Sequence, residues 1–343
     1  MSFEVRISRE KAGDRAGDVY VLIDDAESVR AEVWPQWGFN CLRWQLRQRD
    51  GRWADILYSA PDWEANPVPT RSGHPILFPF PGRMVGGRFA FEGQEYQLPL
   101  NDSTQRHAIH GFTPRNPWRA VEWNGAADSA FVTGQFHLAA DLPGAATQWP
   151  ADFALNVTYR LFRDRLRVEA VVQNLGDGPL PFGLGYHPYF RLPGVHDADV
   201  GGHVLQANVG EMWEAVDNLP TGRRVPVTGD LDFREPRAIG ATHLDAVYTG
   251  IVPGVPRVGT LTEVAKLSHP AAAGEVRFLA DQNFRELVLF TPPHRQAVAV
   301  EPYSCSADAA NLAARGIDSG WRTIHAGGEW EGVVEYAWVL VAL

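Results

Sequence analysis

The segment Gly183–Phe190 (GLGYHPYF) sets one histidine in apolar, glycine-containing surroundings. Imidazole is the side chain whose ordinary pKa lies nearest neutrality, so a firmly held His187 can give or take a proton. In an extended segment, alternation puts Gly183, Gly185, His187 and Tyr189 on one face. The glycines then leave space beside the imidazole, and Tyr189 forms an aromatic wall. The alternative is a hydrogen-bonded core histidine beside a proline turn.

A second candidate for proton transfer is the carboxylate of Glu301, at the end of the segment AVAVE (Ala297–Glu301). On a strand, Glu301 shares its face with the small side chains of Ala299 and Ala297. A carboxylate beside a partly apolar wall has its ionisation tuned, as a general base requires. The alternative is a charged residue at the solvent end of a strand.

Two histidines, His107 and His110, lie in the segment RHAIHGF (Arg106–Phe112). Residues three apart on a strand point to opposite faces, so the two act together only if the chain turns, which Gly111 permits. A metal site would need a third ligand such as Glu301, yet no HExxH helix or cysteine pair supports ligation. A hydrogen-bonding role for one histidine is the favoured interpretation.

Three further polar residues could hold a substrate. Arg83 and Arg88 lie among glycines, but the spacing is neither a P-loop nor a dinucleotide fingerprint. A guanidinium can donate to vicinal hydroxyls or to a phosphate. Asp245, between apolar residues in THLDAVY, could accept hydrogen bonds from a polyol or cap a turn.

The elements that position these residues are predicted to be strands, because apolar residues alternate with period two. Segments 153–175 and 88–98 each predict a hairpin. A single helix is expected, at 308–315 with Ser306 as its cap, and 193–227 is expected to be irregular. No strand–helix alternation occurs, so the prediction is an all-β fold, a large antiparallel β-sandwich with few short helices, forming one domain over residues 1–343.

Composition narrows the possible partners. The chain has 343 residues with a formal net charge of −10, which argues against nucleic acid and against anionic membranes. The two cysteines, Cys41 and Cys305, form no disulfide framework, and the charged N-terminus lacks a signal-peptide core. We therefore expect reduced thiols, a cytoplasmic location, and neither a cofactor nor a bound metal; the oligomeric state stays open.

Taken in order, the motifs resemble the aldose 1-epimerase (galactose mutarotase) family. The resemblance runs from about Gly38 to Glu329, and its elements are HGF ending at Phe112, GYHPYF ending at Phe190, LDAVY around Asp245, VEPYS at Val300–Ser304, and a closing GGE. It implies a β-sandwich of the galactose mutarotase type. It also implies an isomerase that interconverts sugar anomers without a cofactor.

The resemblance further implies roles for individual residues. Glu301 would take the proton of the C1 hydroxyl and His187 would protonate the ring oxygen, with the two roles exchanged on ring closure. His110 would polarise the ring oxygen, Asp245 would hold hydroxyls and Arg83 would orient the sugar. Two departures are Gly82, where family members often have Asn before the arginine, and Tyr186 before the histidine.

Three hypotheses follow. The first is a free aldohexose as substrate. The second is a hexose 6-phosphate, with Arg83 and Arg88 as phosphate ligands. The third is a carbohydrate-binding protein without turnover, consistent with the 12 tryptophans, most of which we nevertheless assign to the core. Catalysis also carries a geometric expectation: His187 and Glu301 should line an open pocket, separated by the width of a pyranose, with no direct contact and neither side chain buried.

Overall fold

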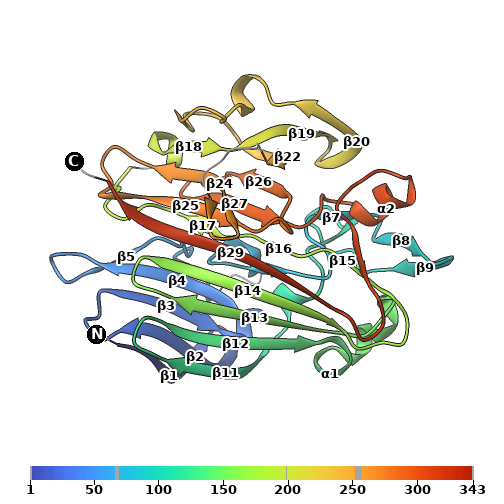
Figure 1. The fold of residues 1–343 in the computed structure, drawn as a ribbon, viewed down its shortest axis with the longest axis horizontal. Helices are drawn as coiled ribbons and strands as arrows, with labels where there is room; N and C mark the ends of the chain where they lie inside the picture. The colour runs from blue at the N-terminus through green and yellow to red at the C-terminus, as the bar shows by residue number, and fades with distance from the viewer. Residues whose placement is uncertain (1, 66–68, 198, 252–256, 342–343) are drawn as a thin grey trace.

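Almost all regular structure in this protein is β-strand (Figure 1). A computed structural model describes residues 2–65, 69–197, 199–251 and 257–341. Its strands form three large sheets and three two-stranded pairs, and every pairing between named strands in the described ranges is antiparallel. The antiparallel all-β prediction is therefore confirmed. Within the same ranges, no helix is both long and apolar enough to cross a bilayer.

The first sheet has five strands in sequence order. They are β1 (Phe3–Ala12), β2 (Arg15–Asp24), β3 (Val29–Trp34), β4 (Asn40–Arg47) and β5 (Trp53–Asp55). The second sheet has ten strands. In spatial order they are β11 (Arg119–Gly125), β12 (Ala130–His137), β13 (Phe153–Leu161), β14 (Arg165–Asn174), β29 (Glu329–Leu340), β25 (Gly274–Ala280), β24 (Leu261–Ser268), β18 (Val204–Ala207) and β21 (Arg237–Ala238), with β23 (Arg257–Val258) beside β24.

The third sheet has eight strands. Its order is β20 (Leu219–Pro226), β19 (Val209–Val216), β22 (Asp245–Ile251), β26 (Glu286–Phe290), β27 (Val298–Tyr303), β16 (Gly185–Tyr186) and β6 (Ile76–Leu77), with β17 (Tyr189–Phe190) also on β27. The pairs are β7 (Arg83–Val85) with β10 (His107–Ile109), β8 (Arg88–Phe91) with β9 (Gln94–Gln97), and β15 (Leu180–Phe182) with β28 (Arg322–Ile324).

The helical segments are short. They are α1 (Leu138–Asp141), α2 (Ala309–Ala314) and the 3-10 turns Pro35–Trp37, Pro69–Arg71, Thr113–Arg115, Pro143–Gln148, Val200–Gly202 and Gly229–Leu231. The helix expected at 308–315 is present as α2. Its predicted cap is wrong: Asp308 precedes the helix, and the Ser306 hydroxyl donates to the carbonyl of Ala307 instead.

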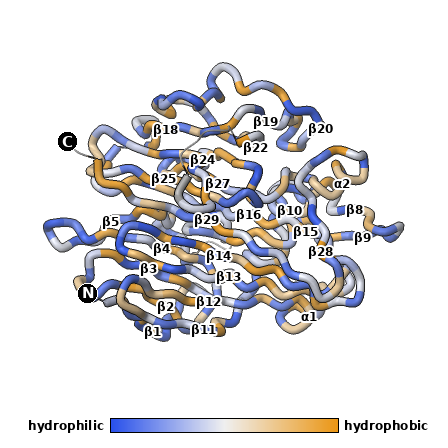
Figure 2. Tube along the Cα trace, in the orientation of Figure 1, coloured by the Kyte–Doolittle hydropathy of each residue, from blue (hydrophilic) through white to orange (hydrophobic). Residues whose placement is uncertain are grey.

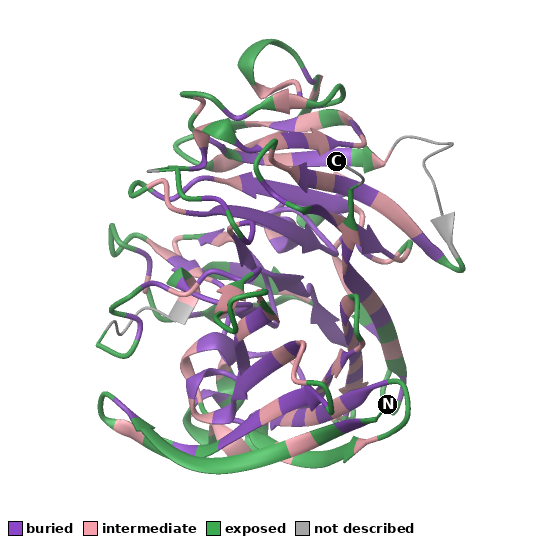
Figure 3. Ribbon diagram, turned by 90° about the vertical axis from the view of Figure 1, so that its left-hand side faces the viewer, coloured by how far each residue is buried: buried purple, intermediate pink, exposed green. Residues whose placement is uncertain are grey.

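Alternating burial explains why the central strands form. Along β12 and β14 every second residue is buried, and these apolar faces join one core that extends from Phe3 to Trp338. Figure 2 shows hydrophobic residues gathered along the central strands, and Figure 3 shows them buried, with exposed residues along edges and loops. The predicted hairpins at 153–175 and 88–98 are both present, as β13–β14 and β8–β9.

The expectation for 193–227 is wrong. That segment contains β18 and the hairpin β19–β20, which turns at Asp217 and Asn218, both with positive φ. Such a turn matches the twist of the strands it joins. Most residues of β20 are half-buried or exposed, so the hairpin lacks the buried alternating face that identified the other strands.

Candidate active site

The eight-stranded sheet carries the two predicted carboxylates on one face. Glu301 on β27 pairs with Val288 on β26, which pairs with Val247 on β22. Asp245 lies two residues before Val247 on the same strand. Because side chains alternate along a strand and align across a sheet, Glu301 and Asp245 lie on the same face.

The predicted histidine lies opposite Glu301. Both β16 and β17 pair with β27, so the two residues between them, His187 and Pro188, pass beside Glu301. The backbone N–H of His187 donates to the carbonyl of Pro75, at 3.0 Å. The imidazole Nδ1 then lies 3.3 Å from Oε1 of Glu301.

This contact overturns the geometric expectation of an open pair separated by a sugar. His187 is 7% exposed and Glu301 is fully buried, so the pair is both in contact and enclosed. The reason is the sheet itself. Neighbouring strands lie about 4.8 Å apart, and side chains opposite each other on such strands cannot be held a pyranose's width apart.

Aromatic groups surround the His187 imidazole. Tyr189 stacks on the ring with 4.8 Å between centroids, as the expected aromatic wall, and its hydroxyl lies 3.5 Å from Nε2. Phe290 meets the ring edge-on at 5.8 Å. Burial disfavours the charged imidazolium and lowers the pKa of His187 to about 3, so the ring is neutral at physiological pH.

Tyr303 holds the Glu301 carboxyl, donating its hydroxyl to Oε2 at 2.7 Å. The Tyr303 ring lies over Gly185, where an added Cβ would be 2.5 Å from the ring. The space left by this glycine is therefore filled by Tyr303 and is not free for a ligand. Burial raises the pKa of Glu301 well above its ordinary value, and the charge of Asp245 adds to that effect.

These two shifts define what the pair can do. A protonated carboxyl with a neutral imidazole has one transferable proton more than a carboxylate with a neutral imidazole, and so has a carboxylate with an imidazolium. The two states differ only in where the proton lies across the 3.3 Å contact between His187 and Glu301. Two groups in this arrangement can both supply and accept a proton.

His110 lies beside this pair. It sits in a left-handed turn with φ of 64°, and its Nδ1 accepts from the backbone N–H of Gly82 at 3.2 Å. The ring centroid lies 5.6 Å from that of His187. The pKa of His110 is well below 6.5, mainly because the ring is buried and also because of the charges of His187 and Arg83. A neutral ring whose Nδ1 accepts carries its proton on Nε2.

Gly82, one of the departures from the family pattern, has a packing reason. Its φ is 67°, and an added Cβ would lie 2.8 Å from Cβ of Ala307. A side chain there would clash with the residues that lead into α2. The glycine therefore lets the chain pass close to Ala307 while its N–H holds His110 and the next residue, Arg83, begins β7.

Arg83 and Asp245 complete the group of sequence-predicted residues. Arg83 is half-buried, and its charge acts on both His110 and Asp245. Asp245 is exposed, yet the packing around its carboxyl raises its pKa, against the opposing effects of Arg83 and a hydrogen bond with Asn218. The five predicted residues, His187, Glu301, His110, Arg83 and Asp245, thus form one cluster.

Two other candidates lie elsewhere. His107 is half-buried on β10, where its Nδ1 accepts from the N–H of Gly86 at 3.2 Å. Arg88 is exposed on β8 and donates to Gln97. Across the described ranges, no three His, Cys, Asp or Glu side chains are grouped to hold a metal ion. Cys41 and Cys305 are free and buried.

Sequence reasoning missed two residues of the cluster. Tyr303 could have been found, because it lies two residues after Glu301 on a strand and must share its face. Asn218 could not, because it lies in the turn of a hairpin that the sequence did not predict.

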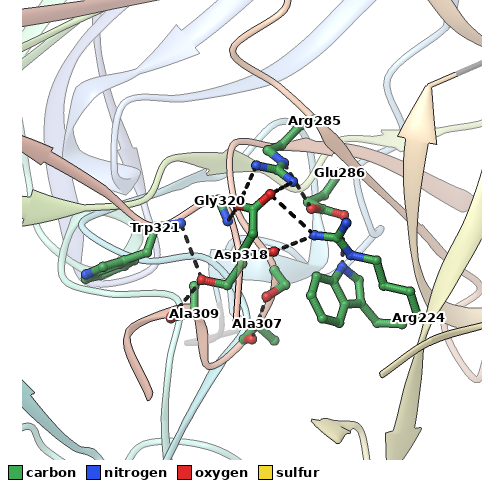
Figure 4. Close-up of polar contacts among 11 residues, drawn as sticks. Arg224, Arg285, Glu286, Ala307, Ala309, Asp318, Gly320 and Trp321 are labelled. Atoms are coloured by element: carbon green, nitrogen blue, oxygen red, sulfur yellow. Dashed lines mark hydrogen bonds and ion pairs between the residues drawn. The ribbon is translucent and has the colours of Figure 1, made fainter. Parts of the chain in front are cut away.

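Outside the cluster, the sequence analysis also did not single out Glu286, a buried carboxyl opposite Tyr303 across β26 and β27. Its Oε2 accepts from the indole N–H of Trp213 at 3.0 Å, and Arg285 lies 3.5 Å from Oε1 (Figure 4). Burial raises the pKa of Glu286 to about 7, and the hydrogen bonds with Trp213 and Thr249 act in the opposite direction.

Replacing Glu286 by glutamine should therefore stabilise the protein at alkaline pH. A carboxyl with a raised folded-state pKa contributes stability that is present below pH 4.5 and lost as pH rises through 7. At about 1.36 kcal/mol per pKa unit, Glu286→Gln should gain about 3 kcal/mol at pH 8.5 and almost nothing at pH 4.5. Urea unfolding at both pH values measures this; an equal gain at both would contradict it.

Comparison with known proteins agrees with this fold. A galactose mutarotase-like protein from Clostridium acetobutylicum superposes with a TM-score of 0.84 at 20% identity, covering 98% of this chain and 99% of that one. Galactose 1-epimerase from Lactobacillus acidophilus gives 0.74 at 19% identity, covering 98% and 99%. The fold is therefore that of the galactose mutarotases, as the sequence motifs implied.

Sequence relatives give the family. The family model for aldose 1-epimerase matches residues 19–337, and the chain belongs to that family. The uncharacterized protein YihR of Escherichia coli K12 is 30% identical over 238 residues, which cover 69% of this chain and 71% of YihR. Galactose mutarotase of Rattus norvegicus is 27% identical over 62% of this chain and 59% of its own length.

Proposed function

We propose that this protein interconverts the α and β anomers of a free aldohexose by acid–base opening and closure of the sugar ring. The observation that carries the proposal is that an imidazole and a carboxyl, those of His187 and Glu301, lie enclosed side by side with 3.3 Å between Nδ1 and Oε1. Anomer interconversion needs one group that removes a proton and another that supplies one, and it needs no other reagent.

The close contact suits this reaction because both reacting oxygens are bonded to the same carbon, C1. One group takes the proton of the C1 hydroxyl while the other protonates the ring oxygen, and the C1–ring-oxygen bond breaks to leave an aldehyde. The pair gains one proton and loses one, so it again holds a single proton. After the C1 end rotates, the reverse transfers close the ring on the other face.

Burial favours the uncharged state of the pair, because it raises the pKa of Glu301 and lowers that of His187. A protonated Glu301 and a neutral His187 make the carboxyl the acid and the imidazole the base for opening, and the two exchange roles on closure. The family resemblance gives the opposite starting roles, which differ only by transfer of the shared proton. His110 donates from Nε2 to the ring oxygen, and Asp245 with Arg83 holds hydroxyls.

The test is polarimetry on freshly dissolved α-D-glucose and α-D-galactose. The protein should accelerate the approach to the equilibrium rotation well above the spontaneous rate. Folded protein that binds either sugar, by calorimetry, without accelerating mutarotation would overturn the proposal and select a carbohydrate-binding protein. The two sugars share C1 chemistry and differ at C4, so their ratio of rates reports on the hydroxyl contacts.

A phosphorylated substrate is the less favoured alternative. Two arginines suggested it. Arg88 donates a hydrogen bond to Gln97 in the β8–β9 hairpin, which is separate from the cluster. Arg83 lies near the Asp245 carboxyl, which would repel a phosphate. Inorganic phosphate should therefore not inhibit the mutarotation of free glucose. Inhibition by phosphate, with faster turnover of glucose 6-phosphate, would favour the alternative.

The pH profile gives a second test. An ordinary histidine titrates near pH 6.5, whereas burial lowers the pKa of His187 to about 3 and raises that of Glu301. Lowering the pH from 7 to 5 therefore leaves the His187 imidazole neutral, and it should cause no loss of kcat/KM near pH 6.5. The spontaneous rate at each pH is subtracted.

The control for this profile is Glu286→Gln, which removes the neighbouring carboxyl that titrates at about pH 7. The parent protein and Glu286→Gln should both keep their kcat/KM over this pH range. A break near pH 6.5 in both would mean that His187 titrates as an exposed histidine does, in contradiction to its burial.

A further inference from the structure

A buried histidine, His74, lies behind the proposed acid–base pair, on the core side of the eight-stranded sheet. It is fully enclosed, and the mechanism above gives it no role. Its ring packs against that of Tyr186, with 4.9 Å between centroids. Because successive side chains of an extended segment point to opposite faces, Tyr186 faces the core while the next residue, His187, faces Glu301.

Both ring nitrogens of His74 contact tyrosine hydroxyls of the ten-stranded sheet. Nδ1 lies 3.0 Å from the hydroxyl of Tyr159 on β13, and Nε2 lies 2.8 Å from that of Tyr336 on β29. The Tyr159 hydroxyl also donates to the backbone carbonyl of His74, at 3.0 Å. A hydroxyl has one proton, so Nδ1 donates to the Tyr159 oxygen and Nε2 accepts from Tyr336.

This pattern of hydrogen bonds needs a neutral ring with one N–H. Burial disfavours the imidazolium and lowers the pKa of His74 to about 3, so the ring is neutral at physiological pH. Tyr159 and Tyr336 are also buried, so water does not compete for their hydroxyls. A buried network in which every member is satisfied is rigid and specifies one arrangement.

The residues on either side of His74 hold the backbone of the segment that carries His187. The carbonyl of Pro75 accepts from the N–H of His187, at 3.0 Å. The carbonyl of Gly73 accepts from the N–H of Tyr189, also at 3.0 Å. These residues lead into β6, which pairs with β16 and is the last strand of its sheet. The sheet therefore supports this segment from one side.

Support from the other side comes from His74 itself. Its backbone N–H donates to Oδ1 of Asn40 on β4, at 2.6 Å, and the Asn40 amide donates to the carbonyl of Ser72, at 2.9 Å. Its ring reaches β13 and β29, which flank β14 in the ten-stranded sheet (Figure 1). The segment around His74 is thus bonded to all three large sheets.

We propose that His74 is a positioning residue for the proposed acid–base pair. Its ring anchors the strand segment before β6 to the ten-stranded sheet, and this segment fixes the backbone of His187 beside Glu301. The kinetic consequence rests on the proposed function, whereas the anchor itself can be tested without turnover. His74 is enclosed behind the pair and does not touch the sugar.

The test of the anchor compares Tyr336→Phe with Tyr186→Phe. Each variant removes one buried hydroxyl beside His74 and keeps the ring. Only the Tyr336 hydroxyl has a partner, because that of Tyr186 is buried without one in the described part of the chain. In Tyr336→Phe the backbone amides of His187 and Tyr189 should exchange with solvent about tenfold faster, because a buried imidazole nitrogen loses its donor.

Hydrogen exchange followed by NMR measures these rates, and the amides of β1 and β2 serve as the internal reference. Their exchange should not change in Tyr336→Phe, because they lie in another sheet. Tyr186→Phe should match the parent protein at every amide. Thermal melts establish that each variant is folded at the temperature of the measurement.

Polarimetry on α-D-glucose gives the kinetic readout. The kcat should fall about threefold to tenfold in Tyr336→Phe and about 10- to 10²-fold in His74→Phe, which removes both ring bonds, because a small displacement of a reacting group is costly. The KM should change less than kcat, since Asp245 and Arg83 hold the hydroxyls from β22 and β7. Tyr186→Phe should keep the kcat of the parent protein.

Four results would overturn the proposal. The first is exchange at His187 and Tyr189 in Tyr336→Phe that matches the parent protein. The second is equally faster exchange in β1 and β2, which would make Tyr336 a general contributor to stability. The third is an equal effect of Tyr186→Phe, and the fourth is faster exchange with an unchanged kcat. A parent protein without mutarotation would refute the proposed function alone, because the exchange rates test the anchor by themselves.

Discussion

Replacing Glu301 by glutamine is expected to slow mutarotation by about 10²- to 10⁴-fold, the usual contribution of a positioned proton donor or acceptor. The amide keeps the size of the carboxyl, and its oxygen can still accept from the Tyr303 hydroxyl. It cannot exchange a proton with His187, so the shared proton of the pair is lost. Polarimetry on α-D-glucose measures the change in kcat.

The matched control is Glu286→Gln, a second buried glutamate on the neighbouring strand and outside the pair. It should keep the rate of the parent protein. Because His187 and Glu301 act as a unit, the double variant His187→Asn with Glu301→Gln should be about as slow as either single variant. A Glu301→Gln protein with the parent's rate, or single-variant effects that multiply, would contradict the shared-proton mechanism.

Replacing His110 by asparagine is expected to lower kcat by about 10²- to 10³-fold, the cost of losing one oriented donor at an atom where charge develops. Asparagine tolerates the left-handed conformation at this position, where φ is 64°. Its shorter side chain cannot bring a donor to the place of Nε2. The KM should change less than kcat, since the donor matters most while the ring oxygen takes up charge.

The chain offers its own control in His107. Its Nδ1 also accepts from a glycine N–H, at the same 3.2 Å as in His110, but it lies on β10 away from His187. His107→Asn should therefore leave kcat unchanged. Equal losses in the two variants would mean that the backbone hydrogen bond, and not the donor at Nε2, carries the effect.

The residues of the cluster could be predicted from the sequence, but their distances could not. Glu301 and His187 stood out because small and aromatic residues alternate around them. Their separation depends on which strands are neighbours. Both β16 and β17 pair with β27, although more than 100 residues separate β27 from either strand in the chain. A period-two pattern states which face a side chain occupies and nothing about its partner across the sheet.

The fold shows the same division. The hairpins β13–β14 and β8–β9 could be predicted, because the residues that specify each hairpin, by their alternation or their turn, lie within the hairpin itself. The hairpin β19–β20 was not, because its stability comes from pairing with β22 and its exposed strand has no apolar face of its own. Its turn residue Asn218, which contacts Asp245, was missed with it.

The two halves of the cluster differ in how freely they can change during evolution. Inserting one residue in β27 would turn Glu301 to the opposite face of the sheet, so the proton-transfer pair tolerates almost no change in chain length. Asn218 lies in a turn that requires only positive φ, which aspartate and glycine also adopt. Exchanges at this turn could therefore alter which hydroxyls Asp245 holds, and new sugar preferences could arise while the chemistry stays the same.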